Sequence, residues 1–342
     1  MTGTPLRPVL TILIGALAAY SGYWYYMSRN AEDYLRDKAR IWSHSGLELE
    51  FDKAEVAGFP YRLVITLGKP KITYTNGLVA FQVLPDDLSI VVQPWQFDHA
   101  LIFASQGSLR FGKGRCLRNA ERYEFSDLSA SARMLDARLS NLSIEAEELR
   151  LTTRNHVIAM VTVQFHWRAA EPTAGSDGGL LEPPIAELAF SAGQMLSVDK
   201  EKQTGIFKNL SVRMTPRGPA NLSLTAGNLE QWRDAGGTLE IDALKADWPD
   251  GAVVASGSIT LDEEMRPLGL MSLDIVNVRA FASRLSSTGF LEESTLAAIR
   301  NGLQSGTNQF ASDTLTFSLS WQAGHAYLES FEIATLDPIF DK

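Results

Sequence analysis

From residue 47 onward, apolar and polar residues alternate in many short segments, and this period of two limits the possible folds more than any other feature. Segment 61–67, for example, would place its large apolar side chains on one face of a β-strand. Turn sequences such as Asn76-Gly77 separate the segments at spacings of about 8–12 residues, which is typical of antiparallel meanders rather than of βαβ units. The sequence therefore predicts a mainly β (α+β) protein with elongated antiparallel sheets and peripheral helices.

One stretch interrupts the alternation. Residues 168–184 are rich in proline and glycine and show no apolar period, which is the composition of a linker or a long loop. We therefore expect a first β-sheet domain over residues 46–167 and a second β-sheet domain with helices over residues 185–342. The helices expected in the second domain cover residues 185–195, 228–235, 278–286 and 292–304.

Residues 9–27 form a single uncharged apolar segment. As a helix it would be just under ~30 Å long, about the thickness of a bilayer core. Aromatic rings, which favour the headgroup layer, gather at its C-terminal end: Tyr20, Tyr23, Trp24, Tyr25 and Tyr26. The sequence therefore predicts a transmembrane anchor preceded by a cytoplasmic tail over residues 1–8.

A stalk helix is expected to continue the anchor over residues 28–45. Its apolar positions include Tyr34, Leu35 and Ile41, which would share one face and dock on the domain. Gly46 follows where a C-terminal cap would stand.

A cleaved signal peptide is the alternative interpretation of the N-terminus, because Ala16 and Ala18 form an A-x-A site after a short apolar core. The apolar run continues through that site into the aromatic residues, so cleavage would leave an exposed apolar N-terminus. We therefore expect the anchor to stay attached.

The charge and the chemistry-bearing residues exclude several classes of protein. The formal net charge of -9 lacks the basic footprint of a nucleic-acid-binding protein. The five histidines show no metal-ligand spacing, and no nucleophile elbow, phosphate loop or dinucleotide fingerprint occurs. Cys116 is the only cysteine, and the acidic groups Asp86-Asp87 and 262–264 are interpreted as solvated turns. We expect no catalytic residue, no metal and no cofactor, and an enzyme is the least favoured class.

Aromatic and proline residues mark three further motifs. Gly58-Phe59-Pro60 opens a strand, where proline removes an unneeded ladder donor, and Trp248-Pro249 opens a turn. We interpret these residues as structural and expect Phe59 and Trp248 to be buried. Trp95, in Gln93-Pro94-Trp95, closes a strand in a similar way.

Together these elements resemble a family of uncharacterised bacterial proteins anchored in the inner membrane, known only as a domain of unknown function. The motifs that carry the resemblance are Gly58-Phe59-Pro60-Tyr61-Arg62, Gln93-Pro94-Trp95, Trp248-Pro249, Leu261-Asp262 and Arg266-Pro267 with Gly269. The chain is also similar in style to the AsmA-like envelope proteins, whose exported sheets present an apolar inner face thought to handle lipids.

The orientation in the membrane follows partly from this resemblance. Counting positive charges would place the domain in the cytosol, because four cations lie within residues 28–40 and only Arg7 precedes the span. A short tail with one arginine is also typical of an export signal. Together with the resemblance, this leads us to expect a single-pass inner-membrane protein with its bulk in the periplasm.

Two functions are therefore held open. The first is a lipid-handling or envelope-maintenance protein with an apolar groove, lined by Leu63, Ile65, Leu67, Phe81, Ile90 and Val92. The second is an anchored interaction module that positions protein partners, in which case the same residues would pack as a sandwich core. The expected partners are the inner membrane, lipid and other envelope proteins.

Overall fold

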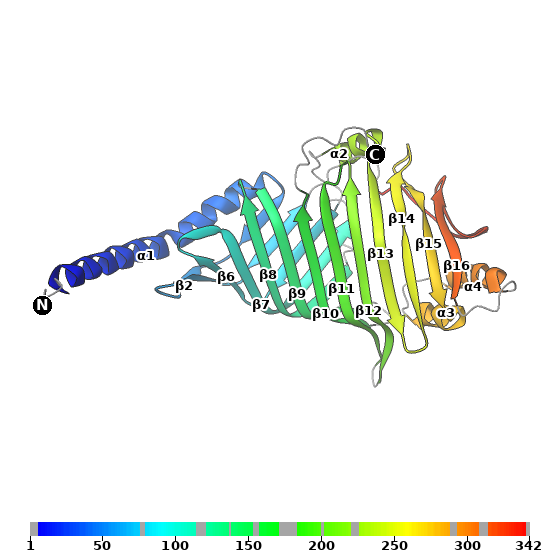
Figure 1. The fold of residues 1–342 in the computed structure, drawn as a ribbon, viewed down its shortest axis with the longest axis horizontal. Helices are drawn as coiled ribbons and strands as arrows, with labels where there is room; N and C mark the ends of the chain where they lie inside the picture. The colour runs from blue at the N-terminus through cyan, green and yellow to red at the C-terminus, as the bar shows by residue number, and fades with distance from the viewer. Residues whose placement is uncertain are drawn as a thin grey trace, which may run out of the picture.

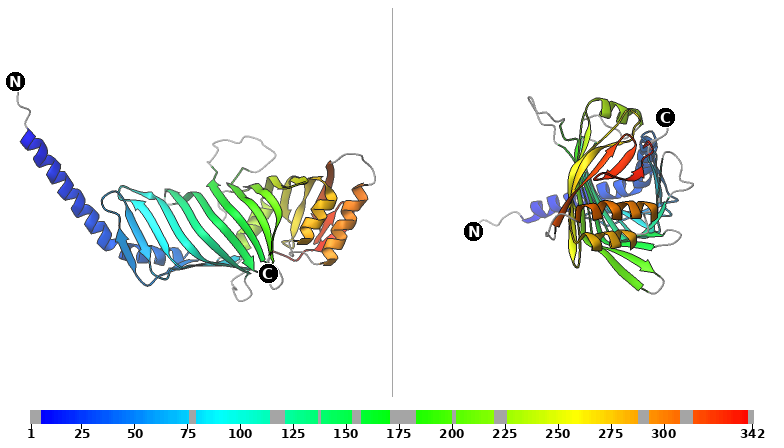
Figure 2. Two further views of the ribbon diagram at one scale, coloured as in Figure 1. Left: turned by 90° about the horizontal axis from the view of Figure 1, so that it is seen from below. Right: turned by 90° about the vertical axis from the view of Figure 1, so that its right-hand side faces the viewer.

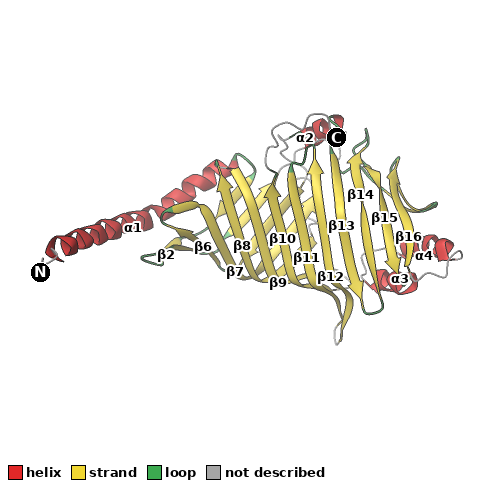
Figure 3. Cartoon of the chain, in the orientation of Figure 1, coloured by secondary structure: helices red, strands yellow, loops and turns green. Residues whose placement is uncertain are grey.

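A computed structural model shows a long, curved antiparallel sheet with one long helix at its N-terminal end and short helices elsewhere (Figure 1). Strands dominate the molecule, as the sequence predicts (Figure 3). The structure describes residues 6–75, 79–113, 121–136, 138–152, 157–170, 183–199, 202–219, 226–287, 293–307 and 314–339.

The N-terminal half contains α1 (Leu6–Ser43), β1 (Leu47–Glu50), β2 (Ala54–Ala57), β3 (Leu63–Leu67), β4 (Lys71–Thr75), β5 (Val79–Pro85), β6 (Leu88–Gln93), β7 (Gln96–Lys113), β8 (Glu121–Leu135), β9 (Arg138–Thr152) and β10 (Val157–Ala169). The C-terminal half contains β11 (Ala186–Asp199), β12 (Lys202–Arg217), α2 (Ala226–Asp234), β13 (Thr238–Trp248), β14 (Gly251–Leu261), β15 (Pro267–Val276), α3 (Val278–Ser287), α4 (Glu293–Thr307), β16 (Thr314–Gln322), β17 (His325–Leu328) and β18 (Phe331–Thr335).

The two expected sheets form one sheet. From β7 to β18, every strand pairs antiparallel with the next strand in the chain, including β10 with β11. β10 and β11 flank the expected linker and pair from Val157–Val198 to Ala169–Ala186. No domain boundary therefore separates them, although residues 171–182 of the linker lie outside the described residues.

The sheet forks at β7. The first part of this strand pairs with β6, which leads through β3 to β2, whereas its last part pairs with β5, which leads through β4 to β1. Gly107 lies where β7 changes partner, and a Cβ there would be 2.4 Å from the ring of Phe125. Helix α1 contacts β1 and β2, the outer strands of the two arms, and so closes the fork.

A hydrophobic core, the anchor-end core, fills the closed fork. Its fully buried members are Ala31, Leu35, Phe51, Ile65, Leu67, Leu88, Ala104 and Phe125. Ala31 and Leu35 of α1 lie one turn apart, and the small alanine allows the helix to approach the sheet closely. The expected docking face is therefore only partly correct, because Tyr34 and Ile41 are exposed. The continuous helix from the apolar span into the stalk is confirmed.

A second cluster, the far-end core, lies at the opposite end of the sheet. It contains Ile158, Met195, Ile206, Phe207, Ala246, Trp248, Val253, Ile275, Val278, Phe281, Phe317 and Leu328. Helices α3 and α4 lie across the inner side of the curved sheet and cover this cluster (Figure 2). Both helices are confirmed, as is α2, each to within a few residues of the predicted bounds.

The predicted helix over residues 185–195 is wrong, because this segment belongs to β11. Its alanine, glutamate and leucine favour a helix. Leu188, Phe190 and Ala192 also alternate, however, and they pair with apolar residues of β10 and β12. Tertiary pairing on both sides therefore overrides the local helix preference.

The in–out alternation inverts along one line across the sheet. From β7 to β12 each strand has one residue at this line that drops out of the pairing while the register continues, called the extra residue below: Ser105, Asp127, Glu147, Thr162, Gly193 and Asn209. Three of them, Asp127, Thr162 and Asn209, have positive φ angles. Phe125 and Leu128 lie on either side of the line and both pack in the anchor-end core. The irregularity therefore keeps apolar side chains on one face despite the odd spacing.

Candidate functional site

A continuous row of apolar residues crosses the inner face of the sheet. The row starts on β3, continues on β6 and β7, and then follows the consecutive strands from β8 to β16. Each of these strands supplies one member, and neighbouring members are register partners. This apolar row consists of Ile65, Ile90, Ile102, Ala130, Ile144, Phe165, Phe190, Val212, Leu244, Ala255, Leu273 and Phe317. Directly paired residues project to the same side of a sheet, so the row forms one strip.

A second row runs beside the first, two residues away along each strand except β13, where an irregularity makes the spacing three. It consists of Leu63, Val92, Ala100, Ala132, Leu142, Trp167, Leu188, Met214 and Ile241. The inner face is thus apolar across its width as well as along its length.

On β8 to β13 the opposite face is polar, whereas on β7 and β15 it also carries exposed apolar side chains such as Phe103 and Leu270. His166 contacts Ser143 through Nδ1 and Oγ at 3.0 Å, and the Thr215 hydroxyl donates to Asp242 at 2.8 Å. These cross-strand pairs alternate with the residues of the apolar row, so the middle of the sheet has one polar face and one apolar face. An antiparallel sheet with this pattern normally packs its apolar face on a core.

Both ends of the apolar row are covered, and its middle is partly exposed. Ile65, Ile90 and Ile102 pack in the anchor-end core, whereas Leu244, Leu273 and Phe317 pack in the far-end core. The members between them, on β8 to β12, are all partly exposed and belong to neither core: Ala130, Ile144, Phe165, Phe190 and Val212. Among the described helices, α1 has its main contacts at β1 and β2, and α3 and α4 have theirs at β12 and β14 to β18.

The six residues predicted to line a groove lie mostly at the closed end. Leu63, Ile65 and Leu67 are almost fully buried in β3 and pair with Val92, Ile90 and Leu88. Phe81 lies in the other arm of the fork, where its ring packs 5.2 Å from that of Tyr74.

The sequence-based prediction did not include the partly exposed part of the face, although the alternation of Val163, Phe165 and Trp167 carried its signal. The extra residue Thr162 hides the continuity of this pattern with Ile158 and Met160. A strict period of two would therefore assign the apolar side chains in the two halves of β10 to opposite faces of the sheet.

Two loops at the anchor end hold α1. The loop between β2 and β3 contains Gly58 and Pro60, and the loop between β6 and β7 contains Pro94. The Tyr20 hydroxyl donates a hydrogen bond to the Pro60 carbonyl, and the Tyr23 hydroxyl donates one to the Pro94 carbonyl at 2.8 Å. The two sequence motifs therefore meet at the aromatic end of the predicted anchor.

Trp24 strengthens the same contact. Its indole N–H donates to the Arg62 carbonyl at 3.3 Å, and its ring packs edge-on against Phe59 with 5.4 Å between centroids. Gly58 has φ +101, and a Cβ there would be 2.7 Å from the Arg62 carbonyl oxygen. Only glycine permits the turn that brings these carbonyls to the helix.

The structure separates the motif residues into exposed and buried ones. Phe59 is 51% exposed and Trp95 is 60% exposed, so the expectation that Phe59 is a core residue is wrong. A tip of only five residues cannot enclose a phenylalanine, and the ring packs on Trp24 of the helix instead. Trp248 is 4% exposed and is a core residue as expected, whereas Pro249 is exposed in the turn that follows.

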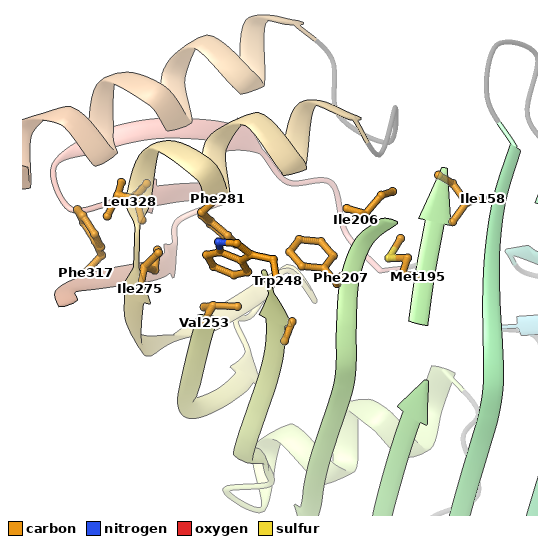
Figure 4. Close-up of a cluster of buried hydrophobic side chains, with 12 residues drawn as sticks. Ile158, Met195, Ile206, Phe207, Trp248, Val253, Ile275, Phe281, Phe317 and Leu328 are labelled. Atoms are coloured by element: carbon orange, nitrogen blue, oxygen red, sulfur yellow. The ribbon is translucent and has the colours of Figure 1, made fainter. Parts of the chain in front are cut away.

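Trp248 occupies the centre of the far-end core (Figure 4). Its ring stacks on Phe281 of α3 at 5.6 Å and meets Phe207 of β12 edge-on at 6.0 Å. The residue therefore joins the helical cover to the sheet.

The Asp262 and Arg266 motif residues organise the turn between β14 and β15. The carboxylate of Asp262 accepts hydrogen bonds from the backbone N–H groups of Glu264 and Arg266 and from the Arg266 guanidinium at 2.8 Å. Burial alone would raise the pKa of Asp262, but these bonds outweigh it and hold the pKa below its usual value. Asp262 therefore stabilises the turn between β14 and β15.

No metal-ligating group was found in the described part of the chain, where no three His, Cys, Asp or Glu side chains are arranged to hold an ion. Cys116 and His156 lie outside the described residues. The apolar face and the two aromatic loops are the features that remain as candidate sites.

The fold and its N-terminal helix define a β-sheet protein with one helix that is long and apolar enough to cross a membrane. The apolar part of α1 projects away from the sheet, and its side chains are exposed (Figure 1). The family model described as "Uncharacterized protein conserved in bacteria (DUF2125)" matches residues 24–337. The chain belongs to this bacterial family, which confirms the resemblance seen in the sequence. No curated protein and no solved structure matches the chain.

Proposed function

We propose that α1 anchors this protein in the bacterial inner membrane and that its apolar sheet face binds lipid acyl chains in the periplasm, without catalysis. The observation that carries the proposal is the apolar row, which continues across β8 to β12 although neither core covers it there. Partly exposed phenylalanines that belong to no core favour a ligand or a partner, because monomers rarely expose large contiguous apolar patches.

The dimensions of this face suit an acyl chain. Strands lie about 4.8 Å apart, so the four gaps from β8 to β12 extend roughly 19 Å. One leaflet of a bilayer core is about 15 Å thick, which is the length its acyl chains span. Each methylene moved from water onto such a face gains about 0.8 kcal/mol. One chain lying along the row would therefore cover its partly exposed middle.

The connection to the membrane supports the same proposal. Helix α1 closes the anchor end of the sheet, and the row begins in the core beneath it. A lipid-binding face is therefore held next to the bilayer from which it would take its ligand. This position beside the bilayer, more than the apolar character of the row, favours lipid over a protein partner.

Photocrosslinking tests the ligand. Benzoylphenylalanine placed at Phe165 or Phe190 retains an aromatic side chain and should form adducts with phospholipid in cells, measured by mass spectrometry of the purified chain. The control is the same probe at His166, the neighbour of Phe165, which is exposed on the polar face. Lipid adducts at positions 165 and 190 alone would support the proposal. Protein adducts there would favour the interaction module instead.

A fusion tests the compartment. Alkaline phosphatase joined after Lys342 should be active, because the enzyme requires export, and the N-terminus of the mature chain should be Met1 or Thr2. A mature chain that starts at Ala19 would show a cleaved signal peptide. An inactive but intact fusion would place the domain in the cytosol.

A further inference from the structure

We infer that the tips of the β2–β3 and β6–β7 loops insert into the headgroup layer of the membrane that α1 crosses. The residues that would insert are exposed aromatics on these loops and at the start of β7: Phe59, Tyr61, Trp95 and Phe97. The inference rests on the anchoring part of the proposed function, and it adds a second contact between the domain and the bilayer.

The contacts of α1 fix the height of the loops along the helix. Pro94 and Pro60 accept their hydrogen bonds from Tyr23 and Tyr20, and Arg62 accepts one from Trp24. These three helix residues lie inside the apolar span, before its last residue, Met27.

The depth follows from the helix rise of about 1.5 Å per residue. Trp24 lies about 5 Å and Tyr20 about 10 Å before Met27 along the helix axis. The interfacial layer on each side of a bilayer core is about 5–8 Å thick. If α1 spans the membrane, the loops that contact Trp24 and Tyr20 must therefore reach the headgroup layer.

The exposed side chains match that environment. Tyr61 is 75% exposed and Trp95 is 60% exposed, which is costly for large aromatics in water. Tyrosine and tryptophan favour the membrane–water interface, where the ring meets an apolar layer and the polar atom stays hydrated. The same preference applies to Tyr20, Tyr23 and Trp24 on the helix beside them. The loops and the helix thus form one aromatic belt.

Two anchoring points have a structural consequence. A helix alone would leave the domain free to tilt about its stalk. The loops fix one edge of the fork at the membrane surface, so the long axis of the sheet keeps a set angle to the bilayer. The far-end core, at the other end of the sheet, is then held away from the surface (Figure 1).

Fluorescent labels measure the depth of the loops directly. The full-length chain, with Cys116→Ser, would carry a single cysteine at Tyr61 or at Trp95, labelled with the environment-sensitive NBD group and reconstituted into phosphatidylethanolamine–phosphatidylglycerol vesicles. Both labels should show emission shifted to shorter wavelength and should be quenched more strongly by a spin label near the headgroup than by one near the acyl end. Both positions are exposed, so the labels disturb no core.

Two control positions separate the possible outcomes. A label at Leu13 in α1 should be quenched by the deep spin label, and a label at Leu270, an exposed apolar residue of β15, should not be quenched by either. Water-like emission at positions 61 and 95 with a quenched label at 13 would overturn loop insertion and leave the anchor intact. Water-like emission at position 13 would overturn the anchor and, with it, this inference.

Discussion

Replacing Trp248 by alanine is expected to lower the free energy of unfolding by about 3–5 kcal/mol, the range observed for aromatic truncations in a core. The ring is almost fully buried and contacts Phe281 on one side and Phe207 on the other. Its removal would leave a cavity between α3 and the sheet that neither neighbour can fill without losing its own contacts. Urea unfolding of the full-length chain in detergent micelles measures the change.

Two matched variants test the reason for this loss. Trp248→Phe keeps an aromatic ring and sacrifices no hydrogen bond, because the buried indole N–H has no partner among the described residues. It should therefore cost far less than alanine. Phe59→Ala removes a half-exposed ring and should cost about 1 kcal/mol, the usual worth of one aromatic pair. A loss at Phe59 equal to that at Trp248 would contradict the division of the motifs into core and loop residues.

Replacing Phe190 by glutamate is expected to weaken lipid binding by about a hundredfold. Phe190 lies in the middle of the apolar row between Phe165 and Val212. An ionised carboxylate there would face acyl chains, and the cost of a charge in such surroundings is about 2.5–3.5 kcal/mol, where 1.4 kcal/mol is tenfold in affinity. Phospholipid recovered with the purified chain, measured by mass spectrometry, should fall accordingly.

The control is Gln194→Glu on the same strand. Gln194 is exposed on the polar face and is the register partner of Lys208, so the new charge is solvated and faces a cation. This variant should retain its lipid. Circular dichroism of both variants shows whether the sheet has formed. A folded Phe190→Glu chain with undiminished lipid would place the lipid elsewhere and remove the main support for the proposed function.

The positions of the helices and the strand content could be predicted because they depend on short-range patterns. Val278–Ser287 has a helical period, and the apolar span before Met27 is an uninterrupted run of membrane-spanning length, so both could be recognised from consecutive residues. The motifs around Gly58 and Asp262 could likewise be recognised as turns, since their chemistry is local.

The candidate site was harder to predict from the sequence, because it depends on the register of distant strands. Leu63, Ile65 and Leu67 have the same local pattern as Phe165 and Trp167. The fork at β7 and the closure by α1 bury the three β3 residues, whereas Phe165 and Trp167 in β10 stay partly exposed. Burial therefore cannot be assigned from alternation alone.

The sequence by itself determined that this chain is a β-sheet protein with an apolar N-terminal helix, because alternation and helical periodicity are properties of consecutive residues. Only the tertiary structure decided that the strands form one sheet with one apolar face. The pairing of β10 with β11 joins the expected domains, and extra residues such as Thr162 invert the alternation on six neighbouring strands at one line. Within a single strand, an extra residue favours neither face of the sheet. It keeps the apolar face continuous only because the neighbouring strands carry theirs at the same level.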